Sequence, residues 1–128
     1  LLNLSEELAR GNVSFPQFFL LGCLDKQRVI TMSGIAGKMG HSTAAATGLV
    51  DRLEKLGYVE RAHASDDRRK VMVQITPKGS ALVAGIRRDI IRSITTLLRD
   101  YLTADERRTW LQIYRKVADY CDNLQKTE

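Results

Sequence analysis

The side chains best suited to chemistry lie in a charged stretch near the middle of the chain. Five basic residues and two aspartates occur within ten positions, and they are Arg61, His63, Asp66, Asp67, Arg68, Arg69 and Lys70. Arginine at the tip of a loop suits the narrow minor groove of DNA, where the negative potential is strongest. An aspartate beside it can hold the guanidinium in place before binding. A charged loop is more often only solvated surface, so this interpretation needs support from the neighbouring residues.

The helix predicted directly before this stretch has an outer face made of small and hydroxyl-bearing side chains. These are Ser42, Thr43, Ala44, Thr47 and Gly48. Small side chains let a helix backbone approach the major groove closely, and serine and threonine can contact base edges or phosphates. Free N–H groups at the start of the helix can also receive a phosphate. Lys38, at the end of the preceding helix, and Arg52 are interpreted as further phosphate contacts.

A helix-turn-helix and a hairpin must position these side chains, and the residue pattern predicts both. Thr31 is a candidate N-cap for a short first helix, and Gly40 follows it as a turn residue. Ser42 or Thr43 begins the second helix, and Gly57 is placed to end it in a left-handed conformation. Two strands with apolar side chains flank the charged loop and complete the hairpin. A plain helical hairpin with a solvated face is the alternative to a DNA-binding motif.

The remaining segments predict helices on both sides of this motif. Leu1–Arg10 carries leucines at helical spacing, and Ser14 can cap a second, apolar helix. A long helix from Pro77 to about Tyr101 would measure roughly 38 Å, and Thr103 begins a capping box for the last helix. The inner stripe of the second motif helix is predicted as Ala46, Leu49, Leu53 and Leu56. The predicted fold class is therefore mainly α with a small β-hairpin.

Length and composition predict a single globular domain. The chain has 128 residues, of which 44% are hydrophobic, enough for one core but not for two independent ones. A formal charge of +5 and a pI near 9.5 favour a polyanionic partner. No apolar run is long enough to span a membrane, and no signal-peptide pattern is present. Because the chain begins with Leu1 rather than methionine, we expect part of the natural N-terminus to precede it.

Cys23 and Cys121 are the only cysteines, and neither belongs to a spacing typical of metal ligands. Cys23 lies in an apolar helix pattern and is interpreted as a small core residue. No histidine or cysteine is accompanied by a base and an orienting partner, and there is no phosphate loop. We therefore expect no cofactor, no metal and no enzymatic activity, and a reducing cytoplasmic compartment.

The chain resembles the MarR family of bacterial transcription regulators over nearly its whole length. The matching motifs are, in order, residues 49–61 (LVDRLEKLGYVER), residues 67–69 (DRR) and residues 75–79 (ITPKG). Their succession is similar to the family's recognition helix, G-x-V-x-R strand, D-x-R wing and L-T-x-x-G turn. Because several separate elements occur in the right order, the resemblance is specific.

The resemblance implies a single domain over residues 1–128 with a winged helix-turn-helix lobe at residues 31–76. The helices at residues 1–12 and 77–128 would interleave with those of a second copy as dimerisation helices. The helix from about Ser42 would read the major groove. Asp67 would brace Arg69, which would enter the minor groove with Arg68 beside it. The implied function is that of a homodimeric repressor on double-stranded DNA with a pseudo-palindromic operator, released by a small aromatic or anionic effector.

The chain departs from the family pattern at Gly48, in a short N-terminal helix, and at Gly34, where an acidic residue would often complete a capping box with Thr31. Gly48 stands where many members have a larger side chain, so base contact there is expected to differ. Gly34 and Gly37 are expected to loosen the first motif helix, because each interior glycine costs up to about 1 kcal/mol relative to alanine.

Two other functions are compatible with the same fold. A winged-helix module that binds protein instead of DNA usually lacks a basic wing, which this chain has. A thiol-oxidation-sensing regulator would use a cysteine in the first helix, and residues 1–10 contain none.

Overall fold

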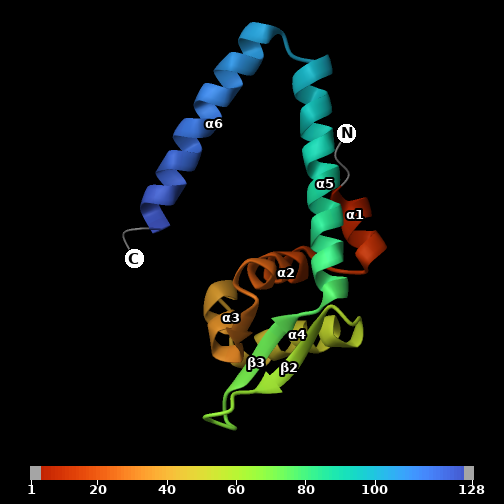
Figure 1. The fold of residues 1–128 in the computed structure, drawn as a ribbon, viewed down its shortest axis with the longest axis vertical. Helices are drawn as coiled ribbons and strands as arrows, with labels where there is room; N and C mark the ends of the chain where they lie inside the picture. The colour runs from red at the N-terminus through yellow and green to blue at the C-terminus, as the bar shows by residue number, and fades with distance from the viewer. Residues whose placement is uncertain (1–3, 126–128) are drawn as a thin grey trace. The chain divides into compact units, whose positions relative to one another are not determined.

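The computed structural model of the protein describes residues 4–125, which form six helices and three short strands (Figure 1). In chain order the elements are α1 (Leu4–Gly11), α2 (Phe15–Gln27), β1 (Val29–Thr31), α3 (Met32–Met39), α4 (Thr43–Lys55), β2 (Val59–His63), β3 (Val71–Ile75), α5 (Pro77–Asp100) and α6 (Ala104–Gln125). The predicted mainly helical fold is confirmed. The chain divides into two compact units, one ending at Ile90 and the other beginning at Ile91.

The sheet of the first unit has three antiparallel strands in the order β1-β3-β2. The hairpin predicted around the charged loop is confirmed as β2 and β3, with Arg61 opposite Val73. Strand β1 was not predicted. It has only three residues and runs directly into the N-cap of α3, so no alternating pattern is long enough to identify it. It pairs with β3 on the side opposite β2, with Ile30 opposite Val73.

The ends of the helices follow the predicted caps. The Thr31 hydroxyl accepts a hydrogen bond from the Gly34 N–H at 3.0 Å, and Ser14 and Gln17 form a complete capping box. Gly40 and Gly57 both have positive φ, 63° and 80°, in the turns that end α3 and α4. The chain can leave each helix sharply at these two glycines because glycine has no Cβ to clash in this conformation.

The core of the first unit is built from α2, α3, α4, the sheet and the start of α5. Its largest fully buried side chains are Leu20, Leu21, Leu24, Ile35, Val50, Leu53, Val59, Val73 and Val83. The predicted inner stripe of α4 is partly wrong, because Val50 is fully buried whereas Leu49 and Leu56 are only half-buried. The buried line is Ala46, Val50 and Leu53, spaced by four and three residues on one helix face.

Gly34 and Gly37 have different surroundings in α3. A Cβ on Gly34 would lie 3.0 Å from the Thr31 hydroxyl oxygen and 3.1 Å from a methyl of Ile30, so glycine leaves room for the cap. Gly37 has no atom within 4 Å of such a Cβ. The expected loosening of α3 by both glycines stays a prediction, and at Gly34 the absence of a side chain also leaves room for the cap.

The second unit contains the end of α5 and all of α6 up to Gln125. The predicted capping box at its turn is confirmed, because the Thr103 N–H donates to Glu106 at 2.8 Å and the Glu106 N–H donates to the Thr103 hydroxyl at 3.3 Å. The hydrogen bond from the Thr103 backbone is the largest cause that lowers the pKa of Glu106, and the Thr103 side chain is the second. Arg107 donates to the carbonyls of Leu98, Arg99 and Leu102, which satisfies acceptors left free at the end of α5. Residues 1–3 and 126–128 of the predicted terminal helices lie outside the described residues.

Two glycine-to-alanine substitutions should change stability in opposite directions. Gly37→Ala should raise the free energy of unfolding by about 0.5–1 kcal/mol, because it removes glycine's entropy cost in an open helical position. Gly79→Ala should lower it by about 1–3 kcal/mol, since its Cβ would overlap the Tyr58 carbonyl oxygen and lie 2.8 Å from Ile75. Urea denaturation at one fixed protein concentration measures both. A loss of stability in Gly37→Ala would contradict the open environment described for it.

Candidate nucleic-acid interface

The N-terminal end of α4 is an exposed, uncompensated positive pole. Ser42 is the N-cap, and its hydroxyl accepts a hydrogen bond from the Ala45 N–H at 3.2 Å. Ser42, Thr43 and Ala44 are all exposed, and the first turn contains no acidic residue. Because the first N–H groups of a helix lack internal partners, this end can attract an anion such as a DNA phosphate.

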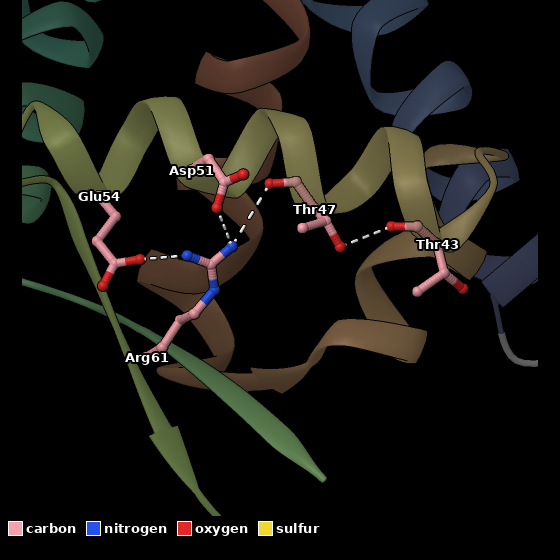
Figure 2. A network of polar contacts seen from close by, with 5 residues as sticks. All are labelled: Thr43, Thr47, Asp51, Glu54 and Arg61. Atoms are coloured by element: carbon pink, nitrogen blue, oxygen red, sulfur yellow. Dashed lines mark hydrogen bonds and ion pairs between the residues drawn. The ribbon is translucent and has the colours of Figure 1, made fainter. Parts of the chain in front are cut away.

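Thr43 and Thr47 lie on the same face of α4, one turn apart (Figure 2). The Thr47 hydroxyl donates to the Thr43 carbonyl oxygen at 2.8 Å. Since its one hydrogen is used inside the helix, Thr47 can offer a partner only acceptor lone pairs and its methyl group. This limits the kinds of base edge that Thr47 can contact directly.

The prediction that Arg61 belongs to the charged loop is wrong. This residue lies on β2 and reaches across to α4, where its guanidinium forms ion pairs with Asp51 and Glu54 (Figure 2). The same group donates to the Thr47 carbonyl oxygen at 3.5 Å, and the side chain is 26% exposed. Burial opposes its charge, but the hydrogen bonds and charges of the two carboxylates outweigh this and raise the pKa of Arg61.

The sequence contains a signal that identifies the direction of Arg61. Alternate residues of a strand point to the same side of a sheet, and Val59, two positions earlier, is buried. Arg61 therefore points toward the helix side, where Asp51 and Glu54 stand three residues apart on one helix face.

The wing is the loop of residues 64–70 between β2 and β3, which extends beyond the helices of this unit in Figure 1. It is closed by hydrogen bonds from the Ala64 N–H to the Lys70 carbonyl and from the Lys70 N–H to the Asp67 carbonyl, both at 3.1 Å. The Asp67 carboxylate accepts from the backbone N–H of Arg69 at 2.9 Å. The expected aspartate brace is thus a turn-forming contact to the backbone, in place of the contact to the guanidinium that was expected. Arg68, Arg69 and Lys70 are exposed.

Three of the predicted DNA contacts share one hollow of about 360 Å³ between α4 and the wing. They are Thr43, Thr47 and Arg69, and the other lining residues are Thr31, Met32, Ser33, Arg61, Lys70 and Val71. Lys38, Arg52 and Arg68 are exposed but do not line this hollow. The structure therefore brings Thr43, Thr47 and Arg69 together. Ser42 and Ala44, like the other three predicted cations, do not line the hollow.

Lys78 makes contacts at the end of α4 that the sequence did not predict. Its ammonium donates to the carbonyl of Leu56 at 2.8 Å and lies 5.1 Å from the centre of the Tyr58 ring. A cation at the C-terminal end of a helix complements the helix dipole. Beside it, the Thr76 hydroxyl donates to the Gly57 carbonyl, and the Thr76 N–H donates to the Tyr58 carbonyl at 3.0 Å. We call this set of contacts the α4–α5 junction.

The cysteines and acidic residues form no second site in the described part of the chain. Cys23 is half-buried against the core and Cys121 is exposed, and both thiols are free. Residues 4–125 hold no group of three or more His, Cys, Asp or Glu side chains able to bind a metal ion. Within the same range, every helix is too short or too polar to cross a bilayer.

The sequence is similar to a known protein family and to individual proteins of Bacillus subtilis. A family model described as "MarR family" matches residues 13–71. The uncharacterized HTH-type transcriptional regulator YfiV of Bacillus subtilis is 43% identical over 80 residues, which are 62% of this chain and 50% of that protein. A second such regulator of the same organism, YwaE, is 30% identical over 121 residues, or 90% of this chain and 67% of that protein. The chain thus spans half the length of the first relative and about two thirds of the second.

Solved structures with a similar fold also include regulators of this kind. The crystal structure of YusO from Bacillus subtilis has a TM-score of 0.79 at 27% identity, covering 91% of this chain and 82% of YusO. A mutant MarR from E. coli complexed with operator DNA has a TM-score of 0.65 at 29% identity, covering 89% of this chain and 81% of that one. At these identities and coverages the likeness extends well beyond the short motifs.

Substitutions of Ser42 should show how much its side chain stabilises the fold as the N-cap of α4. Ser42→Ala should lower the free energy of unfolding by about 1 kcal/mol, because the Ala45 N–H loses its acceptor. Ser42→Asp should retain stability, since a carboxylate is an equally good cap. Thermal unfolding followed by circular dichroism measures both, with Ser42→Gly as an intermediate case. Equal losses in the alanine and aspartate variants would rule out the capping role.

Proposed function

We propose that this chain, which belongs to the MarR family, is a sequence-specific DNA-binding regulator of transcription that acts as a repressor. The observation that carries the proposal is the convergence of Thr43, Thr47 and Arg69 on one hollow beside the free N-terminus of α4. A helix with small exposed side chains and a basic wing beside it can occupy adjacent grooves of one duplex. The E. coli MarR mutant, a structural neighbour of this chain, is complexed with operator DNA, which supports duplex DNA as the partner. The activity is binding, and no catalytic step is proposed.

Each predicted contact has a defined task in this proposal. Helix α4 enters the major groove with Ser42, Thr43, Ala44 and Thr47 toward the bases and phosphates. Arg69 enters the adjacent minor groove, in a loop whose backbone Asp67 holds. Lys38, Arg52 and Arg68 contact phosphates, which fix the position of the protein without reading sequence.

We also propose that the working form is a homodimer. In the single chain α6 exposes an apolar stripe at intervals of four, three and four residues: Ile113, Val117, Tyr120 and Leu124, each at least 53% exposed. A continuous apolar helix face in water favours association, and a second copy of the chain would bury it. Two α4 helices related by two-fold symmetry would then recognise a pseudo-palindrome with half-sites roughly 34 Å apart.

The location and control of the protein follow from the same proposal. A repressor of bacterial operators acts on chromosomal DNA in the cytoplasm. We propose that a small aromatic or anionic effector releases it, in keeping with its family resemblance. The half-buried position of Cys23 against the core does not favour oxidation sensing through that thiol.

Arg69→Ala and Arg52→Ala should weaken DNA binding in different ways. Arg69→Ala should cost roughly tenfold in affinity and reduce the preference for duplexes with a narrow minor groove. Arg52→Ala should weaken binding to all duplexes alike and reduce the slope of log affinity against log salt by about one. Fluorescence anisotropy with A-tract and mixed-sequence duplexes at several salt concentrations measures both. If the unmodified protein bound none of these duplexes at low salt, a protein-binding winged-helix module would replace the present proposal.

A charge placed in the apolar stripe of α6 should prevent dimerisation. Val117→Glu puts a carboxylate on the face to be buried, where an unpaired charge is strongly unfavourable. Arg115→Gln changes the net charge by the same amount on the opposite face of α6 and should leave the dimer intact. Sedimentation velocity at micromolar concentration distinguishes monomer from dimer. A dimer that survives Val117→Glu would show that α6 does not form the interface.

A further inference from the structure

Arg61 spans two turns of the recognition helix α4 from the neighbouring strand. Its guanidinium meets Asp51 and Glu54 and approaches the Thr47 carbonyl, and these three residues occupy positions i, i+4 and i+7 of one helix face (Figure 2). Planar guanidinium groups donate in fixed directions and can pair with two acceptors at once. A displacement of α4 relative to β2 would therefore have to break at least one of these contacts.

The same face of α4 carries the two threonines proposed to meet DNA. Thr43 lies one turn before Thr47, and Asp51 lies one turn after it (Figure 2). Rotation of α4 about its own axis would move all of these side chains together. The opposite face is held by Ala46, Val50 and Leu53, whose burial keeps this face turned toward the core but prescribes no contact direction. On the exposed side, Arg61 adds contacts in fixed directions, which restrict the rotation that the packing still allows.

We propose that Arg61 is a positioning residue that fixes the rotation of α4 about its axis and so determines which base edges Thr43 and Thr47 meet. This inference rests on the proposed function of α4 as the DNA-reading helix. It assigns to Arg61 an effect on sequence discrimination, with no contact to DNA of its own. The two ion pairs already occupy the guanidinium, which is consistent with that assignment.

Charge has to be separated from position, because Arg61 also neutralises carboxylates on the helix that approaches DNA. Loss of Arg61 leaves Asp51 and Glu54 unpaired. Their two carboxylates would then repel DNA phosphates whatever the orientation of the helix. The double variant Asp51→Asn/Glu54→Gln makes the opposite change in charge, since it keeps the cation and removes both anions. If charge alone mattered, this variant would bind DNA at least as well and discriminate as before. If position matters, it should lose discrimination as Arg61→Gln does.

The experiment uses the full chain and duplexes selected by the unmodified protein from a random-sequence library. The measured quantity is the ratio of Kd for a scrambled duplex to Kd for the selected duplex, with the salt slope determined for each. Arg61→Gln and the double variant should each lower this ratio by roughly tenfold with the salt slope unchanged. Arg61→Lys should restore part of the ratio, because an ammonium can pair with one carboxylate but cannot form the fork. Glu60→Gln, at the adjacent exposed position of the same strand, should behave like the unmodified protein.

Two results would overturn the inference. One is a double variant with an unchanged Kd ratio, and the other is Arg61→Gln lowering the salt slope by about one with the ratio unchanged, as expected of a phosphate contact. Circular dichroism reports whether each variant folds, and if Arg61→Gln does not, the double variant decides the question. If the unmodified protein selects no duplex at all, DNA binding itself fails and the inference fails with it. Selection by the unmodified protein together with undiminished variants refutes only the role of Arg61.

Discussion

Helix α4 has to be part of the core on one side and an open surface on the other. A helix of 13 residues is too short to persist alone in water, so its exposed face exists because the opposite face is packed. Ala46, Val50 and Leu53 supply that packing and are fully buried. Ser42, Thr43 and Thr47 therefore do not have to pack in the core, and their side chains can be small and polar. The surrounding helices and the sheet serve to hold this one helix by its apolar side.

The two ends of α4 carry different neighbouring groups, and the positive electrostatic potential is therefore concentrated at its N-terminal end. Ser42 satisfies a single N–H at the start and adds no negative charge there. Lys78 adds a positive charge at the end, where the helix carbonyls would otherwise face solvent. Asp51 and Glu54, the two acidic side chains of α4, are paired with Arg61. The negative charge of α4 is thus neutralised within the lobe, and its positive pole is left open.

Features that depend on neighbouring residues were predictable, and those that depend on the meeting of distant segments were not. The caps at Ser14, Thr31 and Thr103 follow from hydroxyl residues placed before apolar helical patterns, and the structure has all three. Strand β1 exists only because β3 offers it a partner more than forty positions later, so its three residues carry no pattern of their own. Arg61 was counted as a loop cation because the length of β2 depends on its pairing with β3. The segment that holds the candidate site could be predicted, whereas the pairing of Arg61 required knowing that β2 extends as far as this residue.

The α4–α5 junction has a consequence for how a signal can travel. Lys78, Thr76 and the close approach of Gly79 to Tyr58 attach the first turn of α5 to the end of α4 at several points within a few residues. Two elements attached in this way cannot bend independently at their connection. A displacement of the first turns of α5 would therefore be transmitted to the end of α4 through these contacts. A ligand that acted through α5 would then change the orientation of the DNA-binding lobe and leave the internal structure of the lobe unchanged.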